Sequence, residues 1–170
     1  SAMEIQHIEA FLDYYSKVRA RTRRVALLIP EDKLEWSYLP GKFTLGDLVR
    51  HIAAIERWLY AETVFGRPSA YAGCGPELAA GKTAVLAYLD ALHWDSVAMF
   101  SQLTPEKLQA KIKTPAGHPI TCWKWLRRLP EHEIHHRGQI YLLLNQLGIE
   151  TPQLYGLSSE DVLALNQTNP

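Results

Sequence analysis

Three of the chain's seven histidines lie close together in residues 130–148, which read PEHEIHHRGQIYLLLNQLG. At about 100° per residue, His136 shares one narrow helical stripe with four apolar side chains: Leu129, Ile140, Leu143 and Leu147. His132 lies at the edge of that stripe, one turn before His136, so two imidazoles are expected on the buried face. Burying one unpaired polar ring costs about 1–3 kcal/mol. A metal ion removes this cost, because neutral imidazole nitrogens are good ligands and an i, i+4 pair can reach one ion.

His51 is the third candidate ligand. It lies three residues after Leu48 and four before Ile55, on the inward side of an expected helix. Three histidines with one or two open positions are typical of a catalytic metal site, where the open position can bind water, polarise a substrate oxygen or stabilise a thiolate. Nitrogen ligands from His51, His132 and His136 are compatible with zinc, nickel, iron or manganese. The alternative is that the three rings are hydrogen-bonded core residues or line a wet groove.

Three residues close to these histidines are candidates for supporting roles. Asp47 lies one turn before His51 and could orient that ring, although a role at the helix start explains it equally well. Gln139 lies close to the His132 face and could bond a ligand ring. His135 points away from the apolar stripe and is predicted at the surface or behind the ligands.

Two residues on other turns are weaker candidates. His93 lies at a core edge of a separate expected helix and is the reserve fourth ligand. Trp58 could wall an apolar pocket above the metal, although aromatic core packing is the alternative for it and for the other aromatic candidates: Tyr14, Tyr15, Trp123 and Trp125.

The charged side chains are predicted to lie on solvated helix faces. Glu133 and Arg137 stand at i, i+4 in the favourable order for a surface salt bridge. Five basic residues crowd the later turns of the first expected helix, where cations complement the helix dipole: Lys17, Arg19, Arg21, Arg23 and Arg24. Eighteen basic and eighteen acidic side chains balance to a net charge of zero, which argues against a nucleic-acid partner.

Helical spacing of apolar residues predicts four long helices, over residues 4–28, 45–65, 82–103 and 122–147. Thr44 and Asp47 have the form of a capping box at the second helix, and Gly148 ends the fourth. Pro130 lies inside the fourth helix and is expected to kink it just before His132.

The connecting segments are long. They comprise a connector at 31–42, a Gly- and Pro-rich loop at 66–81, a short turn starting at Thr104 and a loop at 111–119. A short helix is expected over 158–165, and no segment shows convincing strand alternation. The predicted fold is therefore all-α: a four-helix bundle with long connecting loops and a short C-terminal helix, forming one domain over residues 3–170.

Composition restricts the setting of the protein. Ser1 and Ala2 before Met3 are interpreted as an expression-tag remnant, and no signal peptide is recognised. No apolar run approaches the roughly 20 residues needed to cross a bilayer, so no membrane partner is expected. Cys74 and Cys122 do not suggest a disulfide framework, and nothing near Cys74 predicts a lowered thiol pKa. A reducing cytoplasm is the predicted location.

The sequence resembles the DinB-like family of bacterial four-helix-bundle proteins. Residues 132–140, HEIHHRGQI, are similar to that family's H-x-x-H-H-R-G-Q signature, and residues 45–53, LGDLVRHIA, are similar to its second-helix start with a single histidine. The resemblance implies a divalent-metal site at His51, His132 and His136, and frequent homodimerisation. Family relatives include S-transferases that use bacillithiol or mycothiol, and mycothiol-dependent isomerases. Pro130 departs from the family's pattern, which predicts an ordinary helix former there, and would shift the geometry at His132.

The leading hypothesis is a metal-dependent enzyme acting on a small-molecule substrate, by thiol transfer to an electrophile or by hydrolysis. Thiol transfer, with a low-molecular-weight thiol as cofactor, is favoured slightly because the sequence supplies no clear general base. A protease is rejected, although His132, Glu133 and His136 match the H-E-x-x-H spacing of zinc metalloproteases, because Glu133 is assigned to the surface salt bridge with Arg137. The alternative is a non-catalytic metal- or ligand-binding module of a stress response.

Overall fold

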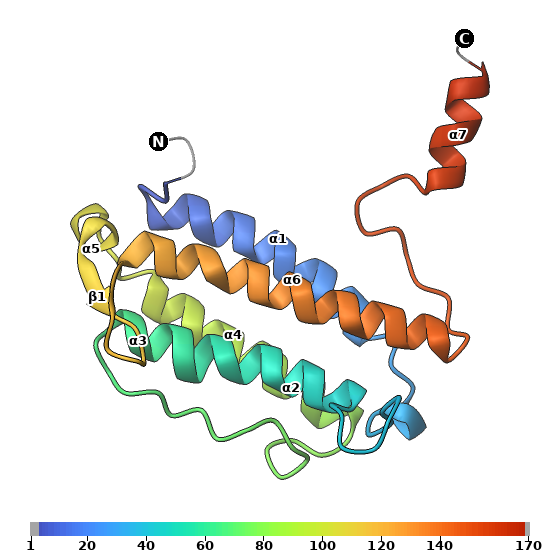
Figure 1. Cartoon of the computed structure of the whole chain (residues 1–170), viewed down its shortest axis with the longest axis horizontal. Coiled ribbons are helices and arrows are strands. Elements are labelled where there is room, and N and C mark those ends of the chain that lie inside the picture. The colour runs from blue at the N-terminus through green and yellow to red at the C-terminus, as the bar shows by residue number, and fades with distance from the viewer. Residues whose placement is uncertain (1–3, 169–170) are drawn as a thin grey trace.

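Four long helical segments pack side by side in the computed structural model, which describes residues 4–168 (Figure 1). They are α1 (Ile8–Ala26), α2 (Leu45–Ile55) with its continuation, α4 (Lys82–Phe100) and α6 (Cys122–Gln146). Helix α6 packs against α1 on one side and α2 on the other, and α4 packs against both α1 and α2. The all-α architecture predicted from the sequence is confirmed.

Local sequence signals set several of the helix ends. The side chain of Thr44 accepts a hydrogen bond from the Asp47 backbone N–H (2.9 Å), and the Asp47 carboxylate accepts one from the Thr44 N–H (3.0 Å), so the predicted capping box starts α2. Thr104 caps the short helix α5 (Pro105–Gln109) in a similar way. Gly148 follows the C-cap residue of α6 and has a φ of 78°, a left-handed conformation that glycine adopts readily, so the predicted glycine stop is observed. Helix α6 continues through Pro130 as one α-helix.

Two short strands correct the expected loop at 111–119. Strand β1 (Lys111–Lys113) pairs antiparallel with β2 (Pro119–Thr121), and Ile112 lies opposite Ile120. Three-residue strands are too short to show alternation in a sequence, but both isoleucines are buried against the bundle end. The first helix also begins four residues later than predicted, at Ile8.

The second long helix is not a uniform α-helix as predicted. After α2 the chain forms a π-helical turn, η2 (Glu56–Ala61), before the last turn, α3 (Glu62–Val64). Such wide turns are uncommon and are often found near functional sites. The side chain of Glu56, at the start of η2, is fully buried.

The core consists of two apolar halves with a buried polar layer between them. One half surrounds the N-terminal part of α6, and the other surrounds its C-terminal part. The intervening layer contains five buried polar side chains contributed by α1, η2 and α6: Arg19, Thr22, Glu56, Glu133 and Arg137. The prediction that Arg19, Glu133 and Arg137 lie on solvated faces is wrong, because each is at most 5% exposed.

The remaining elements are short. A 3-10 turn, η1 (Glu31–Lys33), lies in the first connector, and α7 (Ser159–Thr168) confirms the expected C-terminal helix. Figure 1 shows α7 standing away from the bundle. Within residues 4–168, no helix has the length and apolar character needed to cross a membrane.

Candidate metal centre

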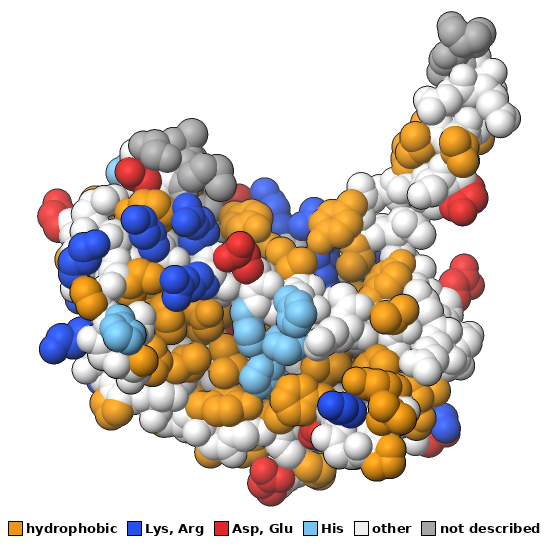
Figure 2. Space-filling view, in the orientation of Figure 1, with side chains coloured by type: hydrophobic (Ala, Val, Ile, Leu, Met, Phe, Trp, Pro, Cys, Tyr) orange, Lys and Arg blue, Asp and Glu red, His pale blue; other side chains and the backbone are white. Residues whose placement is uncertain are grey.

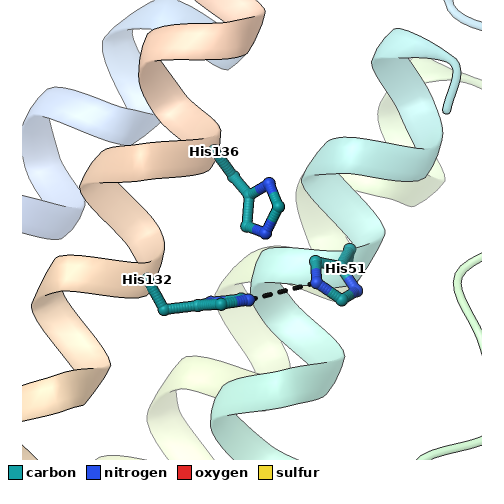
Figure 3. A group of neighbouring side chains, drawn as sticks. All are labelled: His51, His132 and His136. Carbon is teal, nitrogen blue, oxygen red and sulfur yellow. Dashed lines mark hydrogen bonds between the residues drawn. The ribbon is translucent and has the colours of Figure 1, made fainter.

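His51 from α2 converges with His132 and His136 from α6 (Figure 3). The Nε2 atoms of His51 and His132 are 3.1 Å apart, and one nitrogen from each of the three rings lies within 4.8 Å of the other two. The ring centroids are 4.5–5.0 Å apart. In Figure 2 the histidines gather in the middle of one face, bordered by hydrophobic side chains. The structure therefore brings together the three residues selected from the sequence.

Two polar side chains orient the rings of His51 and His136 through hydrogen bonds at Nδ1. The Gln139 side-chain oxygen lies 2.8 Å from His136 Nδ1, and because an amide oxygen can only accept, Nδ1 donates to it. Tyr71 places its hydroxyl 2.8 Å from His51 Nδ1 and can accept that proton in the same way. With Nδ1 protonated on both rings, the Nε2 lone pairs are available as ligands.

The donor set fits a divalent ion. Two nitrogens that each lie about 2.0–2.1 Å from one tetrahedral zinc ion are about 3.3 Å apart, close to the 3.1 Å between His51 Nε2 and His132 Nε2. Without a cation, the ring of His51 or of His132 must carry a proton on Nε2, because the two Nε2 lone pairs would otherwise face each other at 3.1 Å in a half-buried cluster. Three neutral imidazoles suit zinc, nickel, iron or manganese, and the geometry does not select one of these metals.

Burial keeps the three rings neutral. It lowers the pKa of His51 to about 4, with a further contribution from His136, and it lowers the pKa of His132 to about 4 with contributions from His136 and His51. Burial also lowers the pKa of His136, although the hydrogen bond that His136 donates to Gln139 opposes this effect. At neutral pH the site therefore has few protons to release before it binds a metal.

We expect metal binding to depend weakly on pH above about 6.5, the ordinary imidazole pKa. Protons should compete strongly only as pH approaches 4, so the dissociation constant should rise steeply there.

The stability of the metal-free protein should also fall on acidification. Because the folded pKa values lie below 6.5, the unfolded chain binds more protons than the folded one between pH 6.5 and 4, and the unfolding free energy falls as pH falls through that window. Zinc titrations and urea unfolding across this range test both statements. Affinity that already declines steadily between pH 8 and 7 would contradict them.

The turn of α6 that carries the ligands is fixed from its opposite side. The Glu133 carboxylate accepts hydrogen bonds from Tyr15 (2.6 Å), Arg19 (2.8 Å) and Thr22 (2.7 Å), all on α1. Arg137, one turn later, donates to the Val18 carbonyl oxygen at 3.1 Å. Glu133 and Arg137 directly follow His132 and His136 in the chain, so these contacts hold α6 in the rotation that turns both rings toward α2.

The supporting candidates have different outcomes. Gln139 was expected near the His132 face and instead hydrogen-bonds the ring of His136. Asp47 caps α2 and pairs with Arg50 (2.9 Å), and these two contacts explain it without an orienting role at His51. His135 is exposed, with its ring 4.9 Å from that of His136.

The two weaker candidates lie elsewhere. The His93 Nδ1 atom is 3.0 Å from a Glu56 carboxylate oxygen, in the buried polar layer and outside the three-histidine group. Trp58 packs in the core half around the C-terminal part of α6, with the Arg57 guanidinium 4.2 Å from its ring centroid. A fourth-ligand role for His93 therefore has no geometric support among the described residues.

Aromatic side chains that the sequence did not single out surround the histidines. Phe43, before α2, has its ring 5.5 Å from that of His51. Tyr60 of η2 lies 6.4 Å from His132 and stacks on Trp125 at 4.5 Å. Tyr71 belongs to the loop between α3 and α4. Phe43 and Tyr71 lie outside the helices, where apolar periodicity carries no signal.

The chain is similar to known proteins in sequence and in fold. The family model for the DinB superfamily matches residues 14–140. The uncharacterized protein YrdA of Bacillus subtilis is 25% identical over 158 residues, covering 92% of each chain. A DinB-like protein from Bacillus cereus has a similar solved structure, with a TM-score of 0.77 and 22% identity, covering 88% of this chain and 99% of that one. A second DinB-like protein, YjoA from Bacillus subtilis, has a TM-score of 0.63 and 25% identity, covering 80% and 90% of the two chains.

Proposed function

The chain belongs to the DinB superfamily, and from this premise we propose that it is a divalent-metal-dependent enzyme acting on a small molecule. His51, His132 and His136 would hold the metal. The observation that carries the proposal is the convergence of three half-buried imidazoles, two of them oriented through Nδ1 by Tyr71 and Gln139. A structural metal is normally enclosed by four protein ligands, whereas this group offers three.

We favour transfer of a small thiol to an electrophile over hydrolysis. A divalent ion with an open position lowers the pKa of a thiol or water bound there. In the transfer, the thiolate sulfur forms a bond to an electrophilic carbon, and the leaving group departs with the electron pair of the broken bond. The thiol proton goes to solvent. Hydrolysis would need a general base. The Glu133 carboxylate stands at the base position of H-E-x-x-H, but it is buried against α1, where it accepts hydrogen bonds from Tyr15 and Arg19.

The surroundings suit an electrophile with an apolar body. Phe43 lies on one side of the histidines, and the Tyr60–Trp125 stack lies on the other. These residues supply planar apolar surface beside the ligands, which is the usual composition of a small-molecule pocket.

We also propose that the protein acts in the cytoplasm as a homodimer. Cys74 and Cys122 are both free thiols, as expected in a reducing compartment. Family resemblance supports the dimer, and the apolar side chains exposed around the site give it a physical basis.

The test is the rate at which monobromobimane alkylates a panel of small thiols: 2-mercaptoethanol, cysteine, bacillithiol and mycothiol. At about pH 6 an ordinary thiol is less than 1% thiolate, so zinc-loaded protein should accelerate the reaction of at least one thiol by on the order of a hundredfold. The His136→Ala variant is the matched control and should give the uncatalysed rate.

Cobalt-substituted protein separates the alternatives. Thiol transfer predicts a thiolate-to-cobalt absorption band when the active thiol is added. Hydrolysis of activated esters without any thiol effect would identify a hydrolase. A cobalt spectrum that neither thiols nor azide perturb would favour the non-catalytic binding module, because the metal would then lack an exchangeable position.

A further inference from the structure

Helix α7 is not buried against any other part of residues 4–168. All ten of its residues, Ser159 to Thr168, are exposed, and two of its apolar side chains, Val162 and Leu165, share one face of the helix. Figure 1 shows α7 standing clear of the bundle. A ten-residue helix is about 15 Å long and is marginal in water by itself, so a packing surface is needed to hold it.

The start of α7 is nevertheless encoded locally. The Ser158 hydroxyl accepts a hydrogen bond from the Asp161 N–H (3.1 Å), and the Asp161 carboxylate accepts one from the Ser158 N–H (3.0 Å). This reciprocal cap favours helix formation at a defined residue. It also fixes which apolar side chains share a face, because Val162 and Leu165 are three residues apart.

The arm, residues 154–168, comprises α7 and the segment that leads into it. Its root, Leu154 and Tyr155, is attached on the α1 side of α6. Arg21 of α1 donates to the Leu154 carbonyl oxygen at 3.2 Å, and the guanidinium groups of Arg21 and Arg137 both lie over the Tyr155 ring. Arg137 also hydrogen-bonds the Tyr155 hydroxyl. Gly156 follows with a φ of 108°, a conformation that favours glycine, and the chain then leaves the bundle.

An apolar groove of about 480 Å³ lies on the other side of α6, between that helix and the segment leading into α2. Its lining residues are Tyr38, Gly41, Lys42, Phe43, Leu48, Gln139, Leu142, Leu143 and Gln146. Leu142 is 67% exposed, and the neighbouring groove residues Tyr38 and Phe43 are exposed as well. A contiguous exposed apolar patch of this kind often marks an interaction surface. The groove and the root of the arm are at the same end of the bundle, where α6 ends.

We propose that α7 of one copy packs into this groove of a second copy, and that the second copy returns the same contact. Reciprocal exchange is favoured because the arm starts on the α1 side of α6 while its own groove opens on the α2 side. With root and groove at one end, a single two-fold axis satisfies both contacts and closes the assembly as a dimer. The charges are complementary: α7 carries Glu160 and Asp161 and no basic residue, and the only charged residue lining the groove is Lys42.

The exchange would place the second copy's helix beside the metal centre. Phe43 and Gln139 line the groove, and they also contact His51 and His136 respectively. The arm would cover that side of the site and narrow the space left for substrate. This inference rests on the proposed dimer and is independent of the proposed chemistry.

Sedimentation velocity with full-length variants tests the exchange. Leu165→Glu inserts a charge into the face that Val162 and Leu165 share. Gln167→Glu is the matched control because it inserts the same charge two residues later, about 160° around the helix from Leu165. We expect Leu165→Glu, and Leu142→Glu in the groove, to raise the dimer dissociation constant at least about tenfold, equivalent to ~1.4 kcal/mol. Gln167→Glu should behave like the unmodified protein. Circular dichroism should show a folded bundle in each, since neither leucine is buried.

Disulfide trapping identifies the contact directly. In a Cys74→Ser background, a copy carrying Leu165→Cys is mixed with a mass-tagged copy carrying Leu142→Cys, and Gln167→Cys replaces Leu165→Cys in the control. A mixed disulfide between the unlike copies, much weaker in the control, is expected. A monomeric unmodified protein at micromolar concentration would overturn both the dimer and the exchange. A dimer that Leu165→Glu leaves intact, or trapping only within one chain, would overturn the exchange alone.

Discussion

Replacing His136 with alanine will remove stoichiometric divalent metal from the protein. The variant keeps His51 and His132, whose Nε2 atoms are 3.1 Å apart, but it loses one of the three converging rings and the hydrogen bond that Gln139 makes to it. Mutation of a residue that hydrogen-bonds a metal ligand typically lowers metal affinity by about 10–100-fold, so removal of a ligand itself should lower it further. Elemental analysis of untagged, dialysed protein gives the metal content per chain.

His135→Ala is the matched control for this experiment. His135 is adjacent in the chain and also carries an imidazole, but it is exposed and lies outside the three-histidine group. We expect this variant to retain the metal. Equal retention by both variants would show that His136 is not a ligand. If the unmodified protein could not be loaded with zinc, nickel or manganese, the three rings would form a polar groove and the binding-module hypothesis would lead.

Metal binding should also stabilise the fold. A ligand that binds only the folded state at about 1,000 times its dissociation constant adds about 4 kcal/mol to the unfolding free energy. The thermal midpoint should therefore rise when zinc is added to the unmodified protein and change little in His136→Ala. The expected difference has a structural cause, because the ligands bridge two helices, α2 and α6, that also pack against each other.

The convergence of the three histidines was predictable because helical periodicity is a strong signal. His132 and His136 fall on a stripe of apolar residues, and a polar ring at such a position needs a partner. The capping box at Thr44 fixed the start of α2 and therefore the face on which His51 lies. These arguments need only local geometry, which one sequence supplies.

Tertiary partners were not predictable in the same way. Tyr71 reaches His51 from a loop twenty residues further along the chain, and no periodicity describes a loop. Glu133 and Arg137 have the spacing of a surface ion pair, but the packing of α1 against α6 buries both and gives each a different partner. The spacing of charges along one helix does not reveal which face a second helix will cover.

The same difficulty applies to Arg19, one of five basic residues crowded on α1. Its neighbours in the sequence suggested a solvated face, yet its side chain lies between two carboxylates in the polar layer. The distances are 2.8 Å to a Glu56 oxygen and 2.8 Å to a Glu133 oxygen. Burial alone would raise the pKa of Glu133, but the charge of Arg19 and the hydrogen bonds from Arg19, Tyr15 and Thr22 hold it below the ordinary value.

Replacing Arg19 with methionine should lower the unfolding free energy by about 3–5 kcal/mol, as measured by urea denaturation. Methionine fills much of the same volume but leaves Glu56 and Glu133 buried without their shared cation. Arg23→Met is the matched control on the same helix. Its ion pair with Asp90 is about 40% exposed on both sides, and its loss should cost at most about 1 kcal/mol.

The pH dependence distinguishes lost charge from lost packing. Without Arg19, burial should raise the pKa of Glu133 above its unfolded value, so the folded variant binds more protons than the unfolded chain and gains stability as pH falls through that raised pKa. The unmodified protein has Glu133 with a lowered pKa and should lose stability in the same direction. The difference between the two proteins should therefore narrow on acidification, and adding Glu133→Gln to Arg19→Met should recover part of the loss. A deficit that stays constant with pH would mean that packing, rather than the buried charges, accounts for the role of Arg19 in holding α1 against the turn that carries His132 and His136.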